Sequence, residues 1–326
     1  MKSHKAPRLP AGLNSPVWRP SSDQAAYAQK GPDVLEFAKM QALGNDFVVV
    51  SQTDLERLHP VRCQEDLGKV AAALCNRHFG VGADGLVVVR QPDRPDCQLG
   101  WAYFNCDGST AAMCGNGLRC LGLWAVERQL VDRQPFKVST AHGPVEIDVR
   151  DRDSITVDLG QPVLDSSSIP IAGPPRKKVV QEQLTVEDST FSFTCVSMGN
   201  PHCVIFNPAV DPHDYLHLAP LIQHLNLFPE GVNVEFALTD DPGHAKVFVW
   251  ERGCGPTLAC ASGAAAVLVA GVLEGRLVRQ ATIGLPGGCL AVWWGEDGHV
   301  RLTGPAREIY RGAVDLAQVL AEAQRC

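Results

Sequence analysis

Residues 104–117 read FNCDGSTAAMCGNG, and residues 250–263 read WERGCGPTLACASG. The two stretches share one plan: a polar residue lies nine positions before a cysteine, and small residues that include glycine follow this cysteine. The two cysteines are Cys114 and Cys260. A repeated plan of this kind within one chain predicts two structurally similar halves.

The segments behind the two cysteines are apolar on nearly every face. They read GLRCLGLWAVER (117–128) and ASGAAAVLVAGVL (261–273). A helix without a polar stripe has to be surrounded, here by the strands of its own half. Another matching pair, KMQALGNDFVVV (39–50) and VSMGNPHCVIF (196–206), places Gly-Asn before an apolar run, which is typical of a strand entered from a tight turn. Each half is therefore predicted to be a curled sheet around a central helix, with the cysteine at the helix N-terminus.

The composition argues against several classes of protein. The chain has 326 residues, of which 45% are hydrophobic, and this is enough for two separate cores. The formal net charge of −7, with RKK at 176–178 as the one short basic run, predicts no nucleic-acid partner. The longest apolar run, AAAVLVAGVL (264–273), is shorter than the ~18–20 residues that cross a bilayer, so no membrane partner is expected.

The N-terminal segment is predicted to be a flexible extension. Residues 1–34 are rich in Pro and Ser and lack the apolar core of a signal peptide, so a cytoplasmic location with reduced cysteines is expected. Several basic and few acidic residues in this segment leave a plastid transit peptide as the alternative. The predicted division of the remaining chain is an N-terminal domain with Cys114 over 35–158 plus 306–326, and a C-terminal domain with Cys260 over 159–305.

The paired cysteines suggest acid–base chemistry. A helix N-terminus presents free backbone N–H groups and a partial positive charge, which bind anions and lower the pKa of a nearby thiol. Gly115 and Gly117 let a substrate carboxylate approach the backbone closely. With two such ends facing one cleft, one thiolate removes the α-proton of an amino acid while the other thiol delivers a proton to the opposite face. This inverts the stereocentre and requires neither a metal nor an organic cofactor.

Other interpretations of the cysteines stay open at this point. Cys114 with Cys120, and Cys254 with Cys260, form two C-x5-C pairs that are candidates for a zinc site together with His202, although structural zinc spacings are usually shorter. Cys114 and Cys260 are also candidates for a structural disulfide. One of them acting alone as a nucleophile with His202 is a third alternative, and a purely structural role for both is a fourth.

The motifs around these residues resemble the diaminopimelate epimerase family. This family comprises cofactor-independent enzymes that interconvert LL- and meso-2,6-diaminopimelate for lysine and peptidoglycan precursors. The resemblance runs from about Glu36 to about Gly312 and rests on LGNDFVVV, NRHFGVGADG, FNCDGS, MCGNGLRC, VSMGNPHCV, GVNVEF, WERG and LPGG. It implies an α/β (α+β) fold of two pseudo-symmetric domains, each a barrel-like, mostly antiparallel sheet around a central helix. It also implies a homodimer that acts on a small-molecule amino acid substrate.

Carried over position by position, the resemblance assigns roles to individual residues. It implies that Cys114 and Cys260 are the two catalytic bases. The reacting end of the substrate would contact Asn45 and Asn200 and the backbone donors of Gly115, Asn116, Ala261 and Ser262. The distal amino acid head would be bound by Asn105, Asn233 and Arg252. His202 and Glu251 would lie beside the thiols and tune them or orient the substrate, and for His202 a structural, hydrogen-bonded role is an equal alternative.

The sequence departs from the family pattern at three positions. Ala261 occupies a position that is often glycine, which would strain the backbone if φ there were positive. Gly85 stands where some members have glutamine, and this removes one possible substrate contact. Pro256 replaces a glutamate of some members, and proline fits a turn before a helix. Two further functions therefore stay open: a cofactor-independent racemase of another amino acid, and a non-catalytic amino-acid-binding relative.

Overall fold

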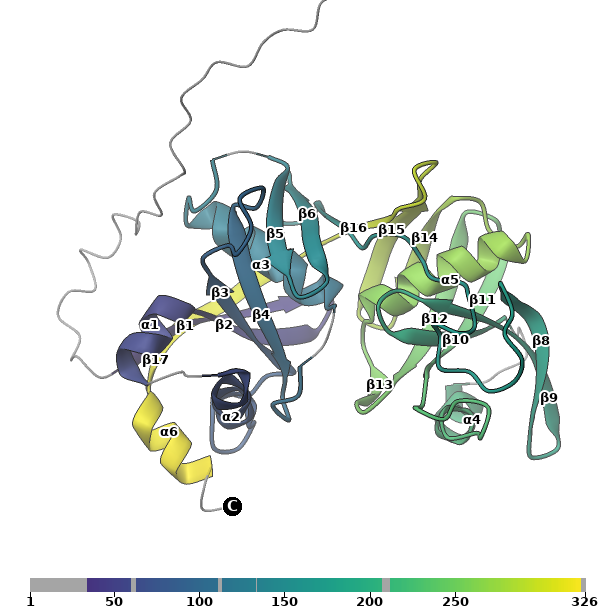
Figure 1. The fold of residues 1–326 in the computed structure, drawn as a ribbon, viewed down its shortest axis with the longest axis horizontal. Helices are drawn as coiled ribbons and strands as arrows, with labels where there is room; N and C mark the ends of the chain where they lie inside the picture. Colours follow the sequence, from purple (N-terminus) through teal and green to yellow (C-terminus); the bar gives the residue numbers. More distant parts are fainter. Residues whose placement is uncertain (1–33, 60–62, 111–112, 133, 207–211, 324–326) are drawn as a thin grey trace, which may run out of the picture.

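The fold consists of two lobes that lie side by side (Figure 1). The computed structural model describes residues 34–59, 63–110, 113–132, 134–206 and 212–323. The predicted extension over 1–34 therefore lies almost entirely outside the described residues. In those ranges, no helix has both the length and the apolarity required to traverse a lipid bilayer.

The first lobe contains Cys114 and is built from elements of the N-terminal half and the chain's last strand and helix. Its strands are β1 (Val34–Ala42), β2 (Asn45–Ser51), β3 (Gly85–Arg90), β4 (Leu99–Asn105), β5 (Phe136–Thr140), β6 (Gly143–Val149), β7 (Ile155–Asp158) and β17 (Arg307–Asp315). Its helices are α1 (Gln52–Leu58), α2 (Gln64–Cys75), α3 (Gly115–Glu127) and α6 (Leu316–Ala323).

The second lobe contains Cys260. Its strands are β8 (Val179–Val186), β9 (Ser189–Ser197), β10 (Pro201–Phe206), β11 (Asn233–Asp241), β12 (His244–Glu251), β13 (Gly255–Thr257), β14 (Gln280–Leu285), β15 (Gly288–Trp294) and β16 (Val300–Gly304). Its helices are α4 (Pro212–Gln223) and α5 (Ala261–Leu273).

Strand pairing repeats from one lobe to the other. The parallel pairs β2–β3 and β4–β5 of the first lobe correspond to β10–β11 and β12–β14 of the second. The antiparallel pairs β3–β4, β5–β6 and β6–β7 correspond in the same way to β11–β12, β14–β15 and β15–β16. The two lobes are joined by the antiparallel pair β7–β16, and β17 returns to the first lobe to pair with β1. The division of the chain into domains at the stated residues stays a prediction.

The two cysteine-bearing helices are the centres of the lobes. Helix α3 packs against β1, β2, β3, β6, β7 and β17, and α5 packs against β9, β10, β11, β14, β15 and β16. Residues Leu118–Ala125 of α3 and Ala261–Gly271 of α5 are buried throughout. Their side chains fill one apolar core together with the inward-facing residues of both sheets. Each apolar helix is therefore enclosed by the strands of its own lobe, as the sequence predicted.

The other helices cover the outer faces of the sheets. Helices α1, α2 and α6 bury a second apolar cluster against β1 to β4, and α4 buries a third against β8 to β12. Both Gly-Asn stretches form tight turns between antiparallel strands, β1–β2 and β9–β10. Gly44 and Gly199 take φ values of 87° and 92° in these turns, a conformation that favours glycine. The turns place Asn45 and Asn200 at equivalent positions at the starts of β2 and β10.

Candidate active site

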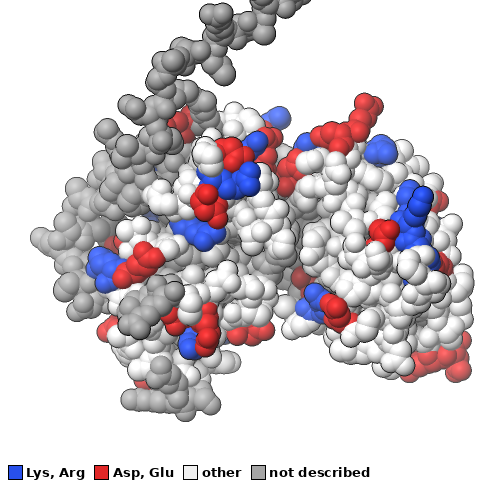
Figure 2. All heavy atoms as spheres, in the orientation of Figure 1, with Lys and Arg blue, Asp and Glu red and all other residues white. Residues whose placement is uncertain are grey.

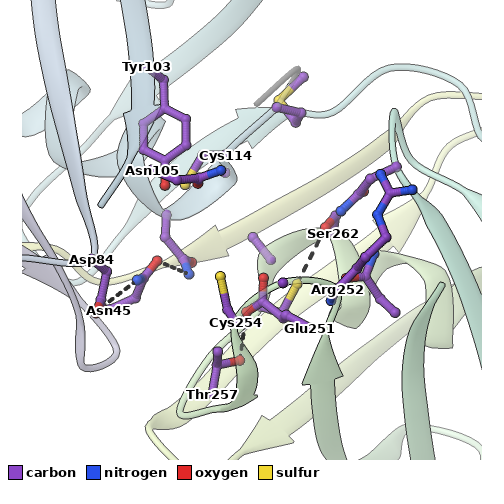
Figure 3. A pocket seen from close by; sticks show the side chains of 18 of the residues that line it. Asn45, Asp84, Tyr103, Asn105, Cys114, Glu251, Arg252, Cys254, Thr257 and Ser262 are labelled. Carbon is purple, nitrogen blue, oxygen red and sulfur yellow. Dashed lines mark hydrogen bonds between the residues drawn. The ribbon is translucent and has the colours of Figure 1, made fainter. Parts of the chain in front are cut away.

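A single cavity of about 860 Å³ lies between the two lobes (Figure 3). The residues that the sequence predicted for the site line it, except His202 and Gly117: Asn45, Asn105, Cys114, Gly115 and Asn116 from the first lobe, and Asn200, Asn233, Glu251, Arg252, Cys260, Ala261 and Ser262 from the second. The cavity brings together residues that lie up to about 220 positions apart in the sequence, from Asn45 to Ser262.

On the face of the molecule shown in Figure 2, Lys and Arg alternate with Asp and Glu and form no continuous basic patch.

Cys114 and Cys260 have the same local structure. Each is the N-cap residue of its helix, with an extended backbone. The Cys114 Sγ accepts a hydrogen bond of 3.3 Å from the Gly117 N–H, and the Cys260 Sγ accepts one of 3.3 Å from the Gly263 N–H. The N–H groups of the first two residues of a helix have no acceptor within it. Two helix ends, each with a cysteine and free N–H donors, therefore face one cavity.

The two helix ends touch each other. A Cβ on Gly115 would lie 2.7 Å from the Ala261 Cβ, so glycine is required at this point of contact. The Asn116 side chain of the first lobe donates a hydrogen bond of 2.9 Å to the Ala259 carbonyl of the second lobe. Ala261 is not among the described residues with positive φ, and it opens α5 in ordinary helical conformation. The strain considered for alanine at this position is therefore absent.

A chain of hydrogen bonds holds the asparagine side chains of the first lobe in place. The fully buried Arg119 donates to the Asn116 Oδ1 at 2.7 Å. Asn116 donates to the Asn45 Oδ1 at 3.0 Å, and Asn45 donates to the Asp84 Oδ2 at 2.7 Å. Arg77, which also lines the cavity, pairs with Asp84 at 2.7 Å. Each amide therefore has its orientation fixed before a substrate binds.

The N–H groups of the helix ends lower the thiol pKa values as expected, but burial outweighs this effect at both cysteines. Burial raises the pKa of Cys114 to about 11, against the opposing effect of the Gly117 N–H, the Tyr103 hydroxyl and the Arg119 charge. Burial also raises the pKa of Cys260, and the carboxylates of Glu251 and Glu235 raise it further. The cost of moving a thiolate out of water outweighs the N–H bonds at both helix ends. Each thiol therefore depends on its nearest donors to ionise.

His202 lies behind the cavity and not in its lining. Its ring is fully buried, with Nδ1 2.6 Å from the Glu235 Oε1 and Nε2 2.9 Å from the Asn200 Oδ1. A protonated ring can donate to both oxygens, so His202 links a buried carboxylate to a cavity-lining amide. The sequence did not indicate Glu235 as a site residue, although a carboxylate within the apolar first half of β11, NVEFAL (233–238), was a signal that could have found it.

Glu251 and Arg252 lie at the end of β12. Glu251 accepts a hydrogen bond of 2.6 Å from Thr257 and another from the Cys260 thiol, and burial raises its pKa. The Arg252 backbone N–H donates to the Asn233 Oδ1 at 2.8 Å, and its guanidinium donates to the Glu230 carbonyl at 3.1 Å. These bonds place a carboxyl group beside Cys260 and a cation at the cavity wall.

The cavity also contains residues that the sequence did not indicate, among them Tyr103 and Thr257. Tyr103 lies on β4 two residues before Asn105, so alternation along the strand could have placed it on the same face. Cys120, the partner of Cys114 in the C-x5-C pair, is fully buried in the core instead. Among the described residues, no three His, Cys, Asp or Glu side chains are placed to hold a metal ion.

Comparisons with known proteins cover almost the whole described chain. A family model described as diaminopimelate epimerase matches residues 37–164 and 194–309. The chain is 42% identical over 286 residues to the diaminopimelate epimerase of Desulfitobacterium hafniense, a match that covers 86% of this chain and 98% of that relative. It is also 42% identical over 289 residues to "Diaminopimelate epimerase, chloroplastic" of Oryza sativa subsp. japonica, which covers 86% of this chain and 80% of the rice protein.

Solved structures of more distant proteins share the fold. The hydroxyproline epimerase from Agrobacterium vitis superposes with a TM-score of 0.65 at 13% identity, over 86% of this chain and 92% of that one. A PhzF-family phenazine biosynthesis protein from Bacillus anthracis superposes with a TM-score of 0.59 at 13% identity, over 86% and 99% of the two chains. The predicted fold class is thereby confirmed.

Proposed function

The chain belongs to the diaminopimelate epimerase family, and we propose a two-base mechanism by which this isomerase interconverts LL- and meso-diaminopimelate. Cys114 and Cys260 act as the two bases on opposite faces of one α-carbon. The observation that carries this mechanism is the pair of abutting helix ends, each capped by a cysteine that faces the shared cavity. Equivalent groups on both sides of one carbon are what inversion by proton transfer requires.

The helix ends hold the substrate carboxylate in this mechanism. Gly115, Asn116, Ala261 and Ser262 open the two helices and line the cavity, so their backbone N–H groups and both helix dipoles favour an anion there. Negative charge develops on this carboxylate when the α-proton leaves, so donors fixed in advance stabilise the transition state. Asn45 and Asn200, held by their hydrogen bonds, complete the binding of the reacting end.

In each direction of the reaction, one cysteine removes a proton and the other delivers one. One cysteine, as thiolate, takes the α-proton: the Cα–H bond breaks and an S–H bond forms. The other cysteine, as thiol, gives its proton to the opposite face of the carbanion and becomes the thiolate. The reverse reaction exchanges the two roles, and no cofactor takes part.

The other end of the cavity binds the second amino acid head of the substrate. Asn105, Asn233 and Arg252 line the cavity and are the residues we assign to this head, with Arg252 as the cation for the distal carboxylate. An amino acid without a second head would lose these polar contacts and would offer no carboxylate to the Arg252 cation. This arrangement favours diaminopimelate over amino acids with a single head.

Proton exchange in D2O tests substrate and mechanism together. With LL-diaminopimelate as substrate, we expect one deuterium at the α-carbon of each meso product, because the delivered proton comes from a solvent-exchanged thiol. Mass spectrometry and the loss of the α-proton NMR signal measure this uptake. Binding without any exchange would indicate a non-catalytic relative. Faster exchange with one of a panel of single-headed L-amino acids would indicate a racemase of another substrate.

We also propose that the protein is a homodimer. Ile309 and Tyr310 on β17 are large apolar residues with exposed fractions of 53% and 47%. Adjacent exposed apolar side chains on one strand favour contact with a second copy. We expect light scattering to give the mass of two chains, and Tyr310→Asp to shift it toward one chain. Val278→Asp, at an equally exposed site on the other lobe, serves as the control and should leave the mass unchanged.

The cellular location stays a prediction. The rice relative is named as chloroplastic. The segment that would distinguish a cytoplasmic chain from a plastid one, residues 1–34, lies almost wholly outside the described residues.

A further inference from the structure

Tyr103 places a hydroxyl group beside one of the two cysteines. It lies on β4 and lines the cavity together with Cys114. In Figure 3 its ring extends from the strand toward Cys114 and Asn105. No other part of the proposed mechanism uses this hydroxyl.

The position of the Tyr103 ring is tightly determined. Its ring stacks on Trp101 with centroids 5.6 Å apart and meets Phe47 edge to face at 6.1 Å. A Cβ on Gly85, across the β3–β4 pair, would lie 2.8 Å from both the Tyr103 hydroxyl oxygen and a ring carbon. The tyrosine therefore occupies the space of the side chain that is absent at Gly85. The residue that departs from the family pattern creates the room for this hydroxyl.

In each lobe a hydroxyl group lies beside the cysteine, but it comes from a strand in the first lobe and from the helix in the second. In the second lobe, the Ser262 Oγ lies 3.4 Å from the Cys260 Sγ, two residues along α5. The equivalent residue of the first lobe is Asn116, whose amide group is already bonded to Asn45 and to the Ala259 carbonyl. Conversely, the residue eleven positions before Cys260, as Tyr103 is before Cys114, is the apolar Val249. Each thiol thus has one hydroxyl neighbour, on a strand in one lobe and on a helix in the other.

Tyr103 keeps its proton under working conditions. Burial raises the pKa of its hydroxyl well above the ordinary value, and the neighbouring Cys114 raises it further. A hydroxyl that stays protonated is a donor to an anion, and a hydrogen bond to the charged form of a group favours that form. The Tyr103 hydroxyl lowers the pKa of Cys114, against the larger effect of burial.

We propose that Tyr103 is a further catalytic residue, whose hydroxyl donates a hydrogen bond to the Cys114 Sγ and stabilises its thiolate in the half of the cycle in which Cys114 carries no proton. This role rests on the two-base function proposed above. Its counterpart for Cys260 is the hydroxyl of Ser262.

The variant Tyr103→Phe removes the hydroxyl and keeps the ring. A hydrogen bond to a charged group is worth about one to two pKa units, and a less stabilised thiolate is also more nucleophilic. We therefore expect the alkylation of Cys114 by iodoacetamide at pH 8.5 to slow by about 3- to 10-fold, as measured by peptide mass spectrometry. Alkylation of Cys260 in the same sample should keep its wild-type rate. The value of kcat/KM should fall about 10-fold, equally in both directions because the equilibrium constant is fixed.

Tyr215→Phe is the matched control. Tyr215 is also a buried tyrosine, and its hydroxyl donates to the Val249 carbonyl outside the cavity lining. Its loss should leave the alkylation of Cys114 unchanged, even if the melting temperature falls. An unchanged Cys114 alkylation rate in Tyr103→Phe would overturn the proposal, whatever the change in melting temperature. The alkylation assay needs no turnover, so its result is independent of whether the wild-type protein exchanges deuterium with diaminopimelate.

Discussion

Replacing either Cys114 or Cys260 by alanine is expected to lower the rate of epimerisation of unlabelled LL-diaminopimelate by at least about 1,000-fold. Each thiol is the only acid–base group that caps its helix end, and the cycle needs one proton removed and one delivered. The loss of either group leaves one face of the α-carbon without a partner. Conversion of LL- to meso-diaminopimelate, followed by chiral chromatography, measures the effect.

Cys289→Ala is the control for this pair of variants. Cys289 is an exposed free cysteine on β15 and does not line the cavity. Its replacement should preserve both the activity and the folding of the chain. Turnover close to wild type in Cys114→Ala or Cys260→Ala would rule out the two-thiol mechanism. A large loss in Cys289→Ala would show that the assay reports general damage to the protein.

The variant His202→Ala is expected to destabilise the folded chain by about 3–5 kcal/mol at neutral pH. Glu235 is fully buried, its Oε1 is bonded to His202, and its Oε2 has no partner among the described residues. Removal of His202 leaves a buried carboxylate with neither charge nor hydrogen bond to compensate it. Unfolding in urea, followed by circular dichroism, gives the change in free energy.

The size of this loss should depend on pH. Burial raises the pKa of Glu235, and the charge of His202 opposes this effect. Without His202, the carboxyl pKa in the folded chain lies further above its unfolded value of 4.5. A group whose folded pKa is raised in this way binds more protons when folded, so the penalty is absent well below pH 4.5 and grows as the pH rises. The difference between wild type and variant should therefore be larger at pH 8 than at pH 5.

His244→Ala provides the matched control for His202→Ala. His244 pairs with Asp241 at 3.0 Å, but both side chains are exposed, and exposed pairs contribute about 0–1 kcal/mol. The double variant His202→Ala with Glu235→Ala should recover part of the lost stability, because no charge then remains buried. An equal loss in His202→Ala at pH 5 and pH 8 would contradict the assigned role of Glu235.

Several parts of the fold were readable from the sequence because they depend on local pattern. The all-apolar segments behind Cys114 and Cys260 predicted central helices, and the Gly-Asn turns predicted the entries to β2 and β10. The stretches GLVVVR (85–90) and LGWAYFN (99–105), which are rich in β-branched or aromatic residues, form strands β3 and β4. The outer helices α1, α2, α4 and α6 were not anticipated, although Gln64–Cys75 has apolar residues at helical spacing.

The repeat, the placement of one cysteine at each helix start and the family follow from the sequence alone, because spacing along the chain and motif identity carry this information. The three-dimensional structure was needed to see that the two helix ends touch through Gly115 and Ala261, that Glu235 lies behind His202, and that Tyr103 fills the space at Gly85. It also decided that burial raises the thiol pKa values. These facts depend on strand register and on the exclusion of water between segments far apart in the chain, and no local pattern encodes either.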